Sequence, residues 1–154
     1  MIKFSKLTDY AVVVLSALYQ SDEGLVSAVT LANRTRLPEP TVSKVLKLLV
    51  KAELVTSTRG ANGGYKLAHV ADKITIQSIA EAIEGPVALT ACVTEHEHEC
   101  SISGTCPVNG RWNKVNDAVK EALQSVTLLD MAASETFLNT NNYKTNEYNE
   151  GSLR

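Results

Sequence analysis

All three cysteines of the 154-residue chain lie in one stretch, which reads CVTEHEHECSISGTC from Cys92 to Cys106. His96 and His98, two of the three histidines, lie in the same stretch. It has no strand pattern, and the glycine and proline near its end favour a loop. Cysteines gathered in one polar loop, with little apolar sequence to bury them, indicate metal ligands or reactive thiols rather than small core residues.

Zinc binding and thiol catalysis are two chemistries that cysteines and histidines in one loop could support. Cys92, Cys100 and Cys106 with His96 or His98 would satisfy the tetrahedral Cys3His preference of structural zinc. A thiol enzyme is disfavoured, because the chain has no C-x-x-C and no third group nearby to orient a Cys–His pair. We therefore expect a ligand site and not an enzyme.

The overall composition indicates a small, mainly aliphatic core. Hydrophobic residues make up 44% of the chain and aromatic residues only 5%, and the length suits one domain, or one small domain plus an oligomerising arm. The apolar run from Ala11 to Tyr19 follows Lys3 and Lys6 as in a signal peptide, but Asp9 interrupts the basic region and no small-x-small cleavage site follows. We interpret the run as a core helix and expect a cytoplasmic protein with reduced thiols and no membrane partner.

The formal net charge of −2 hides a division along the chain. Residues 1–70 carry nine Lys/Arg against five Asp/Glu, a balance of +4, whereas residues 71–154 carry six against twelve, a balance of −6. A basic front half on an acidic chain is typical of a nucleic-acid-binding domain joined to a regulatory half.

The basic half contains a helix-turn-helix pattern. After a first helix capped by Ser5 or Thr8, a short helix capped by Ser27 or Thr30 ends near residue 35. A turn leads to a second helix from about residue 39, whose buried stripe leaves hydroxyls and lysines outside. Two short helices joined in this way are typical of DNA-binding proteins, with the second lying in the major groove. The exposed residues near its start are Thr41, Ser43, Lys44 and Lys47.

A glycine-rich hairpin follows directly, over residues 54–67 in the sequence LVTSTRGANGGYKL. Its glycines permit the positive φ angles of a tight turn, and Arg59 lies at the entrance to the tip. A hairpin directly after a helix-turn-helix is a wing. Another helix, from about residue 74 to residue 83, is capped by Thr75 and ended by Gly85 and Pro86.

Beyond the cysteines, apolar residues alternate spacings of three and four, which predicts one long helix over about residues 108–134. The seam consists of Trp112, Val115, Val119, Ala122, Val126, Leu129 and Ala133. Such a seam could pack on the domain's own core, but a long arm after a compact domain more often pairs with a second copy, so we expect a homodimer. Residues 135–154 are rich in Asn, Thr, Glu and Ser without periodicity, which predicts a disordered tail.

Several of these segments resemble one known family. The run LTDYA at residues 7–11, the helix-turn-helix, the wing RGANGGY at residues 59–65 and the three-cysteine loop are similar to the Rrf-two family of winged-helix regulators, with its IscR-like and NsrR-like members. The run WNKVNDAVKEAL at residues 112–123 resembles the SUF-type regulators of iron–sulfur cluster assembly operons. The resemblance covers about residues 1–134.

Membership in that family would imply a homodimer on a palindromic DNA operator and an iron–sulfur cluster, usually 2Fe–2S, with 4Fe–4S as the other type. It would place the cluster on Cys92, Cys100 and Cys106, although seven residues separate the first pair where five is commoner. The IscR-like histidine three residues after the last cysteine is Asn109 here, a poor ligand for such a site.

The fourth ligand therefore distinguishes two branches of the family. The NsrR-like branch uses an acidic residue of the first helix, donated by the other subunit, and Asp9 stands at that position. We expect Asp9 of the partner subunit to be the fourth ligand, with His96 or His98 as the second choice. The resemblance also implies that the wing arginine, Arg59, enters a minor groove.

The sequence thus predicts a mainly α protein with four parts. They are a winged helix-turn-helix domain over residues 1–85, a cluster-binding loop over residues 86–107, a dimerisation helix over residues 108–134, and the tail. Its expected function is a transcriptional regulator, a repressor of iron–sulfur cluster assembly genes, that responds to cluster status or to redox or nitrosative stress and takes no small-molecule substrate. The alternative is a winged-helix DNA-binding protein with the Cys3His zinc site.

Overall fold

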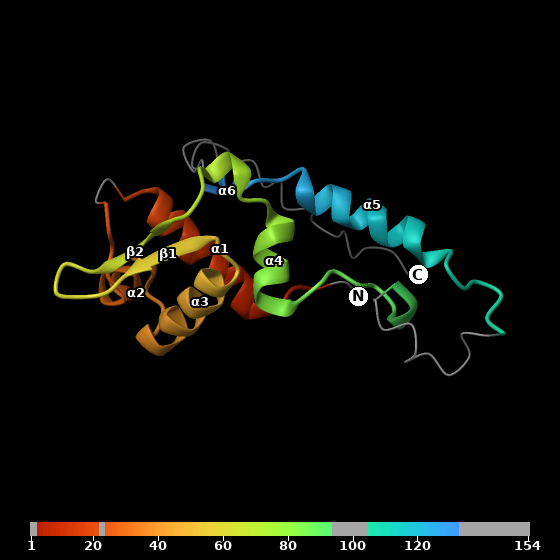
Figure 1. Ribbon diagram of the computed structural model, residues 1–154, viewed down its shortest axis with the longest axis horizontal. Coiled ribbons are helices and arrows are strands. Elements are labelled where there is room, and N and C mark those ends of the chain that lie inside the picture. Colours follow the sequence, from red (N-terminus) through yellow and green to blue (C-terminus); the bar gives the residue numbers. More distant parts are fainter. Residues whose placement is uncertain (1–2, 22–23, 94–104, 133–154) are drawn as a thin grey trace, which may run out of the picture.

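Helices dominate the structure, and one two-stranded hairpin accompanies them in the described residues. The computed structural model describes residues 3–21, 24–93 and 105–132, and no helix in these ranges is long and apolar enough to cross a membrane. Helices α1 to α4, α6 and the hairpin gather at one end, and α5 extends away from them (Figure 1). The elements are α1 (Lys6–Tyr19), α2 (Ala28–Thr35), α3 (Glu39–Lys51), β1 (Val55–Thr58), β2 (Gly64–Leu67), the 3-10 helix η1 (Ala71–Lys73), α4 (Ile76–Glu84), the 3-10 helix η2 (Ala91–Val93), α5 (Trp112–Gln124) and α6 (Leu128–Ala132).

Hydroxyl side chains cap α1, α2 and α4. The side chains of Ser5, Ser27 and Thr75 each accept a hydrogen bond from the backbone N–H three residues later, at 3.4, 3.1 and 3.1 Å. Each bond satisfies one of the N–H groups that the first turn of a helix leaves without an intrahelical partner. The sequence predicted Ser5 or Thr8 as the cap of α1 and Ser27 or Thr30 as the cap of α2. In both helices the serine is the cap.

The helix-turn-helix predicted from the sequence is present as α2 and α3. Arg36 ends α2 in the left-handed conformation, with φ of 56°, and Pro38 precedes α3. The two helices pack on α1 through fully buried aliphatic side chains, each worth about 1.5–3 kcal/mol of burial. These side chains are Val14, Leu15, Leu31, Val42, Val45, Leu46 and Leu49. The packing decides which face of α3 is left outside, and that face carries Ser43, Lys44 and Lys47.

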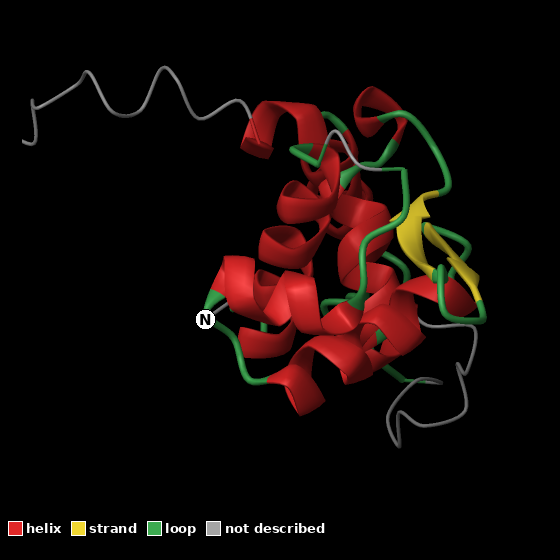
Figure 2. Cartoon of the chain, turned by 90° about the vertical axis from the view of Figure 1, so that its left-hand side faces the viewer, coloured by secondary structure: helices red, strands yellow, loops and turns green. Residues whose placement is uncertain are grey.

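The hairpin is the predicted wing. Strands β1 and β2 are antiparallel, with Val55 opposite Leu67. Val26, which precedes α2, pairs with Tyr65: its N–H donates to the Tyr65 carbonyl at 3.0 Å, and the Tyr65 N–H donates to the Val26 carbonyl at 2.8 Å. Figure 2 shows the wing beside the helices, joined to them at its base. The winged-helix fold class is therefore confirmed.

Gly64 lies where the wing backbone comes closest to Val26. A Cβ at Gly64 would lie 2.9 Å from the carbonyl carbon and oxygen of Val26. We expect Gly64→Ala to force the wing away from Val26 and to lower the free energy of unfolding by about 1–3 kcal/mol, the usual effect of overpacking. Urea denaturation measures the loss. Gly24→Ala is the control, because no atom lies within 4 Å of its added Cβ; equal losses would contradict the account.

Two helices replace the single helix predicted over residues 108–134. Helix α5 ends at Gln124 and α6 begins at Leu128. Thr127 and Asp130 form a reciprocal cap between them: the Thr127 N–H donates to the Asp130 carboxylate at 2.8 Å, and the Asp130 N–H donates to the Thr127 hydroxyl at 3.3 Å. The prediction of one continuous helix was wrong, because the apolar spacing runs through this cap without a break. Residues 133 and 134 and the predicted tail lie outside the described residues.

Helix α6 belongs to the winged-helix core. The Leu128 N–H donates to the Ile74 carbonyl at 2.7 Å, and the Ile76 N–H donates to the Val126 carbonyl at 2.9 Å. Leu128 is fully buried, whereas Leu129, the predicted seam position, is 38% exposed. Helix α6 packs on α1. The described chain therefore leaves the core at α4, passes through the cysteine segment and α5, and returns to the core at α6.

Candidate DNA interface and cysteine segment

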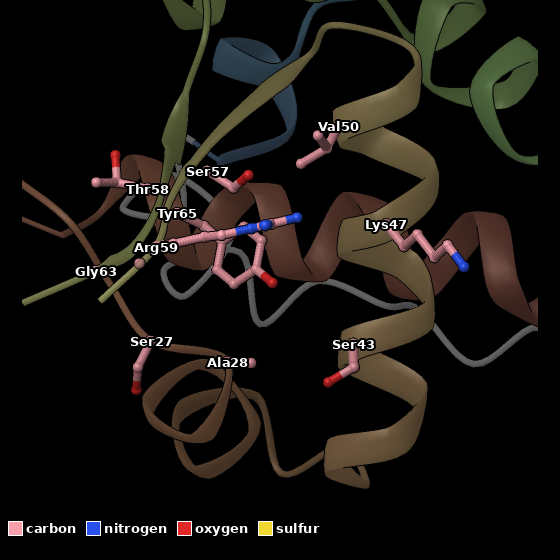
Figure 3. A pocket seen from close by; sticks show the side chains of 11 residues that line it. Ser27, Ala28, Ser43, Lys47, Val50, Ser57, Thr58, Arg59, Gly63 and Tyr65 are labelled. Atoms are coloured by element: carbon pink, nitrogen blue, oxygen red, sulfur yellow. The ribbon is translucent and has the colours of Figure 1, made fainter. Parts of the chain in front are cut away.

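A groove of about 520 Å³ lies between α3 and the wing (Figure 3). The start of α2 contributes to its wall. Most of the side chains that line it are small or carry hydroxyls, and two carry a positive charge. The lining residues are Ser27, Ala28, Ser43, Lys47, Val50, Ser57, Thr58, Arg59, Gly63, Gly64 and Tyr65.

Three of the five residues predicted to contact DNA line this groove. Ser43 points from α3 toward the groove, and the Arg59 side chain extends from the wing toward α3 (Figure 3). Lys47 lines the groove with its stem, while its ammonium lies on the side of α3 away from the wing (Figure 3). Lys44 is exposed on α3 and Thr41 is half-buried, and neither lines the groove.

The exposed face of α3 has the shape and chemistry to enter a DNA groove. An α-helix fits the major groove, where hydroxyls and lysines reach base edges and phosphates. On α3 the residues Ser43, Lys44 and Lys47 follow helical spacing along one exposed face. The wing lies beside that face and presents Arg59, so that a helix and a cationic loop are offered to the same side of the molecule.

The cysteine segment is described only at its two ends. Cys92 lies in η2 and Cys106 lies before α5, and both are free thiols that are half-buried. The hydroxyl of Thr90 lies 3.2 Å from the Cys92 sulfur. Cys100, His96 and His98 lie outside the described residues. Within the described ranges, no three His, Cys, Asp or Glu side chains come together as a metal site.

Asp9, the predicted fourth ligand, lies in the first turn of α1. Its side chain is exposed and lines a cleft of about 360 Å³ between α1, the start of α4 and the α5–α6 junction. The cleft is mostly apolar, with lining residues Phe4, Ser5, Thr8, Asp9, Val12, Ile76, Leu123, Val126 and Met131. Because the Asp9 carboxylate is exposed and lines this cleft, a molecule that binds in the cleft could contact it.

Glu84 ties the start of α1 to the end of α4. Its carboxylate accepts hydrogen bonds from the Ser5 N–H, at 2.8 Å, and from the Thr8 hydroxyl. The bonds from Thr8 and then Ser5 lower the pKa of Glu84 below its ordinary value of 4.5. Glu84 is the last residue before Gly85 and the segment that leads to Cys92. Thr8, which precedes Asp9, is therefore hydrogen-bonded to the residue from which the chain continues toward Cys92.

The lowered pKa of Glu84 predicts a small dependence of stability on pH. A carboxyl whose pKa is lower in the folded state stabilises that state above its unfolded pKa, about 4.5, and loses the contribution as the pH falls through the folded pKa. We expect Glu84→Gln to remove this acid-side slope and, because the group is exposed, to cost less than about 1 kcal/mol at neutral pH. Urea denaturation against pH measures both effects. Glu53→Gln, which alters an exposed carboxylate in a turn, should keep the wild-type slope.

Two residues that hold these elements together were missed by the sequence analysis. A carboxylate at the C-terminal end of a helix opposes the helix dipole, and Glu84 therefore carried a usable indication of a specific partner. Asn116 of α5 is 2% exposed and bonds the backbone before Cys92. Nothing in the sequence marks it, because its partners are backbone groups that lie 27 and 29 residues earlier.

Comparison with known proteins decides the family. The model of Rrf2, described as an iron-dependent transcriptional regulator, matches residues 4–134. The chain belongs to the Rrf2 family. The resemblance noted from LTDYA, the helix-turn-helix, the wing and the cysteines is thereby confirmed, and the matched residues include every described element from α1 to α6.

Three Rrf2-type relatives illustrate the similarity. The transcriptional regulator NsrR of Oceanobacillus iheyensis is 33% identical over 131 residues, which are 84% of this chain and 89% of the relative. The structure of CymR, the global cysteine regulator of B. subtilis, matches with a TM-score of 0.65 at 33% identity and covers 86% of this chain and 98% of that chain. The structure of T. potens IscR matches with a TM-score of 0.60 at 33% identity, covering 86% and 87%.

Membership in Rrf2 establishes the general function. The protein is a DNA-binding transcriptional regulator and not an enzyme. The relatives carry different names, of which one specifies cysteine regulation, so membership alone does not select a signal, a cofactor or a set of target genes.

Proposed function

We propose that this Rrf2 protein is a homodimeric repressor whose affinity for its operator depends on an iron–sulfur cluster held by Cys92, Cys100 and Cys106. One observation carries the proposal: Cys92 and Cys106 are free, half-buried thiols at the two ends of a segment between α4 and α5. Thiolates are the ligands that iron–sulfur clusters prefer, so the donor set fits. The proposed cluster is 2Fe–2S, and 4Fe–4S is the second choice. The proposed target genes of the repressor are those for iron–sulfur cluster assembly.

When bound, a cluster would supply redox and ligand-exchange chemistry that responds to cluster supply, oxidants or nitric oxide. The residues of this chain would convert a displacement of the cysteine thiols into a movement of the helices joined to them. Cys92 is joined through residues 85–91 to α4, which packs on α1 and α3 of the DNA-binding part. Cys106 leads into α5. Movement of either thiol is therefore transmitted to the winged helix and to the arm.

The exposed apolar face of α5 supports the homodimer. Trp112 and Val115 are 40% and 46% exposed, and Val126, just beyond the end of α5, is 37% exposed. Apolar side chains spaced along one helix stay exposed only at a cost of about 25 cal/mol per Å². A second copy that covers them would recover that free energy, and it would bring two α3 helices to the two half-sites of a palindromic operator.

Asp9 of the partner subunit is proposed as the fourth ligand, with His96 or His98 as the second choice. The exposed carboxylate at the edge of the apolar cleft supports this, because a paired copy that packs there would meet it. Asp9→Ala should then alter the visible spectrum and make the cluster more labile. Asp72→Ala, which changes an exposed carboxylate of η1, is the matched control. An unaltered spectrum and lability in Asp9→Ala would reject Asp9 as a ligand.

On DNA, α3 would lie in the major groove with Thr41, Ser43, Lys44 and Lys47, and Arg59 would enter the adjacent minor groove. Ser43 lines the groove beside the wing and would contact bases, whereas the ammonium of Lys47 faces away from the wing and would contact a phosphate (Figure 3). The half-burial of Thr41 limits it to a short reach from the start of α3.

Anaerobic purification tests the proposed function. We expect a coloured protein that contains iron and sulfide and whose binding to a DNA duplex, selected from random sequence with the holo protein, changes by at least about tenfold when the cluster is removed. Cys106→Ser should abolish the colour. A colourless protein that contains stoichiometric zinc would establish the Cys3His alternative instead. If the protein contains iron and sulfide but binds DNA equally well with and without the cluster, it is a cluster-binding protein and the proposed sensing role is rejected.

A further inference from the structure

Asn116 is a polar residue buried in a helix that is otherwise largely exposed. Its side chain is 2% exposed, and it is the one buried residue of α5. An apolar residue would be the ordinary choice for such a position, because burial of an amide costs free energy unless its hydrogen bonds are replaced. The observation calls for partners, and the structure provides them.

Both ends of the Asn116 amide bond the backbone of one segment. The side-chain oxygen accepts from the Leu89 N–H at 3.0 Å, and the side-chain NH₂ donates to the Val87 carbonyl at 3.2 Å. The acceptor and the donor are thus matched to a C=O and an N–H two residues apart, as a neighbouring strand would match them. This pair of bonds fixes the register of residues 87–89 along α5.

Cys92 lies three residues beyond the bonded segment. Residues 86–90 form no helix or strand of their own, and η2, which contains Cys92, packs on α5. Only Thr90 and Ala91 separate this anchor from Cys92, and the turn of η2 restrains them further, because the Val93 N–H donates to the Thr90 carbonyl at 3.2 Å. At its other end the segment begins beside Glu84, which is held by α1.

We infer that Asn116 is a positioning residue for the Cys92 thiolate and the hydrogen-bonded link between the thiol site and α5. The inference rests on the proposed function for the role of Cys92 as a ligand. Groups that orient a metal ligand without touching the metal commonly change metal affinity by 10- to 100-fold. Asn116 acts in this way through the backbone, because it holds the chain from which the ligand extends.

The first test measures the Cys92 thiol in protein without a cluster. In a full-length chain that keeps Cys92 and carries Cys100→Ser and Cys106→Ser, Asn116→Leu removes both bonds at similar volume, and Asn116→Asp keeps the acceptor but sets an oxygen against the Val87 carbonyl. We expect both variants to change the rate of Cys92 alkylation by iodoacetamide by at least about tenfold. Deuterium exchange at the Leu89 amide should accelerate as much in Asn116→Leu, which removes the acceptor of that N–H, and less in Asn116→Asp, which keeps it. Asn113→Leu, at an exposed position on the same helix, should change neither.

A second single-thiol chain separates positioning from general loss of structure. It keeps Cys106 and carries Cys92→Ser and Cys100→Ser, and here Asn116→Leu should leave the alkylation rate unchanged. Equal effects on the two thiols, or none on Cys92, would overturn the inference.

The holo protein provides an independent measurement. Asn116→Leu and Asn116→Asp should lose the visible absorption of the cluster about 10- to 100-fold faster than Asn113→Leu under the same chelator. Loss at the rate of the control would also overturn the inference. If the unmutated protein contains no iron or sulfide, the proposed function fails, while the alkylation and exchange measurements still decide whether Asn116 positions Cys92.

Discussion

Replacing Leu128 with alanine is expected to lower the free energy of unfolding by about 2–5 kcal/mol. Leu128 is fully buried, with an exposed fraction of 0%, and its N–H donates to the Ile74 carbonyl at 2.7 Å. The backbone at this position therefore cannot shift freely to fill the space that the lost methyl groups leave. Urea denaturation followed by circular dichroism measures the loss.

Leu129→Ala is the matched control, because it makes the same truncation one residue later in a side chain that is 38% exposed. We expect it to cost less than about 1 kcal/mol within a single chain. Leu129 also lies on the predicted seam, so both variants are compared at two protein concentrations, since a dimer contribution to stability grows with concentration. A greater loss for Leu129→Ala than for Leu128→Ala at both concentrations would contradict the placement of α6 in the core.

The winged helix could be predicted from the sequence because its determinants are local. Ser5, Ser27 and Thr75 precede apolar periodicity, and glycines mark the wing turn. Each of these indications acts within a few residues. The break between α5 and α6 was local too, in Thr127 and Asp130, but the apolar spacing continues through it and concealed it. Periodicity alone does not record that Leu128, rather than Leu129, meets the core.

The site divides in the same way. Residue type and spacing identified Cys92, Cys106, Ser43 and Arg59 as functional candidates, because the thiols lie in one polar segment, Ser43 lies on the exposed face of the second helix of a helix-turn-helix, and Arg59 lies at the turn of the wing. Their relative arrangement did not follow, and neither did Asn116, whose partners are backbone groups of Val87 and Leu89. Such bonds depend on which segments meet in the folded chain, and no side-chain pattern encodes them.

Three hydrogen-bonded junctions lie along the chain between the start of α1 and α6. Glu84 fixes α1 to the end of α4, Asn116 fixes the following segment to α5, and the backbone bonds at Ile74 and Ile76 fix the α5–α6 junction to the start of α4. Helix α5 is thus attached to the core near both of its ends. These bonds connect the segment that leads to Cys92 with α1 through Glu84 and with α5 through Asn116.

Replacing Arg59 with alanine is expected to cause the largest loss of DNA affinity. Arg59 is exposed, comes from the wing and extends toward α3 (Figure 3), where it lines the groove with Ser43. An arginine contact in a DNA groove is worth about 1–2 kcal/mol, and a homodimer makes it twice. The expected loss is therefore about 2–4 kcal/mol, which is roughly 30- to 1,000-fold in affinity. Fluorescence anisotropy with a duplex selected from random sequence by the unmutated protein measures it.

Lys66→Ala is the matched control, since it removes the same charge from the neighbouring strand of the same wing at an exposed position outside the groove. We expect Lys66→Ala to lower DNA affinity by less than about fivefold. The two Lys66 side chains of a homodimer would act only through an attraction to phosphates that salt screens. Replacing A·T by G·C pairs where the wing meets the duplex should weaken the unmutated protein and leave Arg59→Ala little changed, because a narrow A·T minor groove is what attracts the guanidinium. Equal losses for Arg59→Ala and Lys66→Ala on both duplexes would reduce Arg59 to one positive charge among several and would remove the wing from sequence recognition.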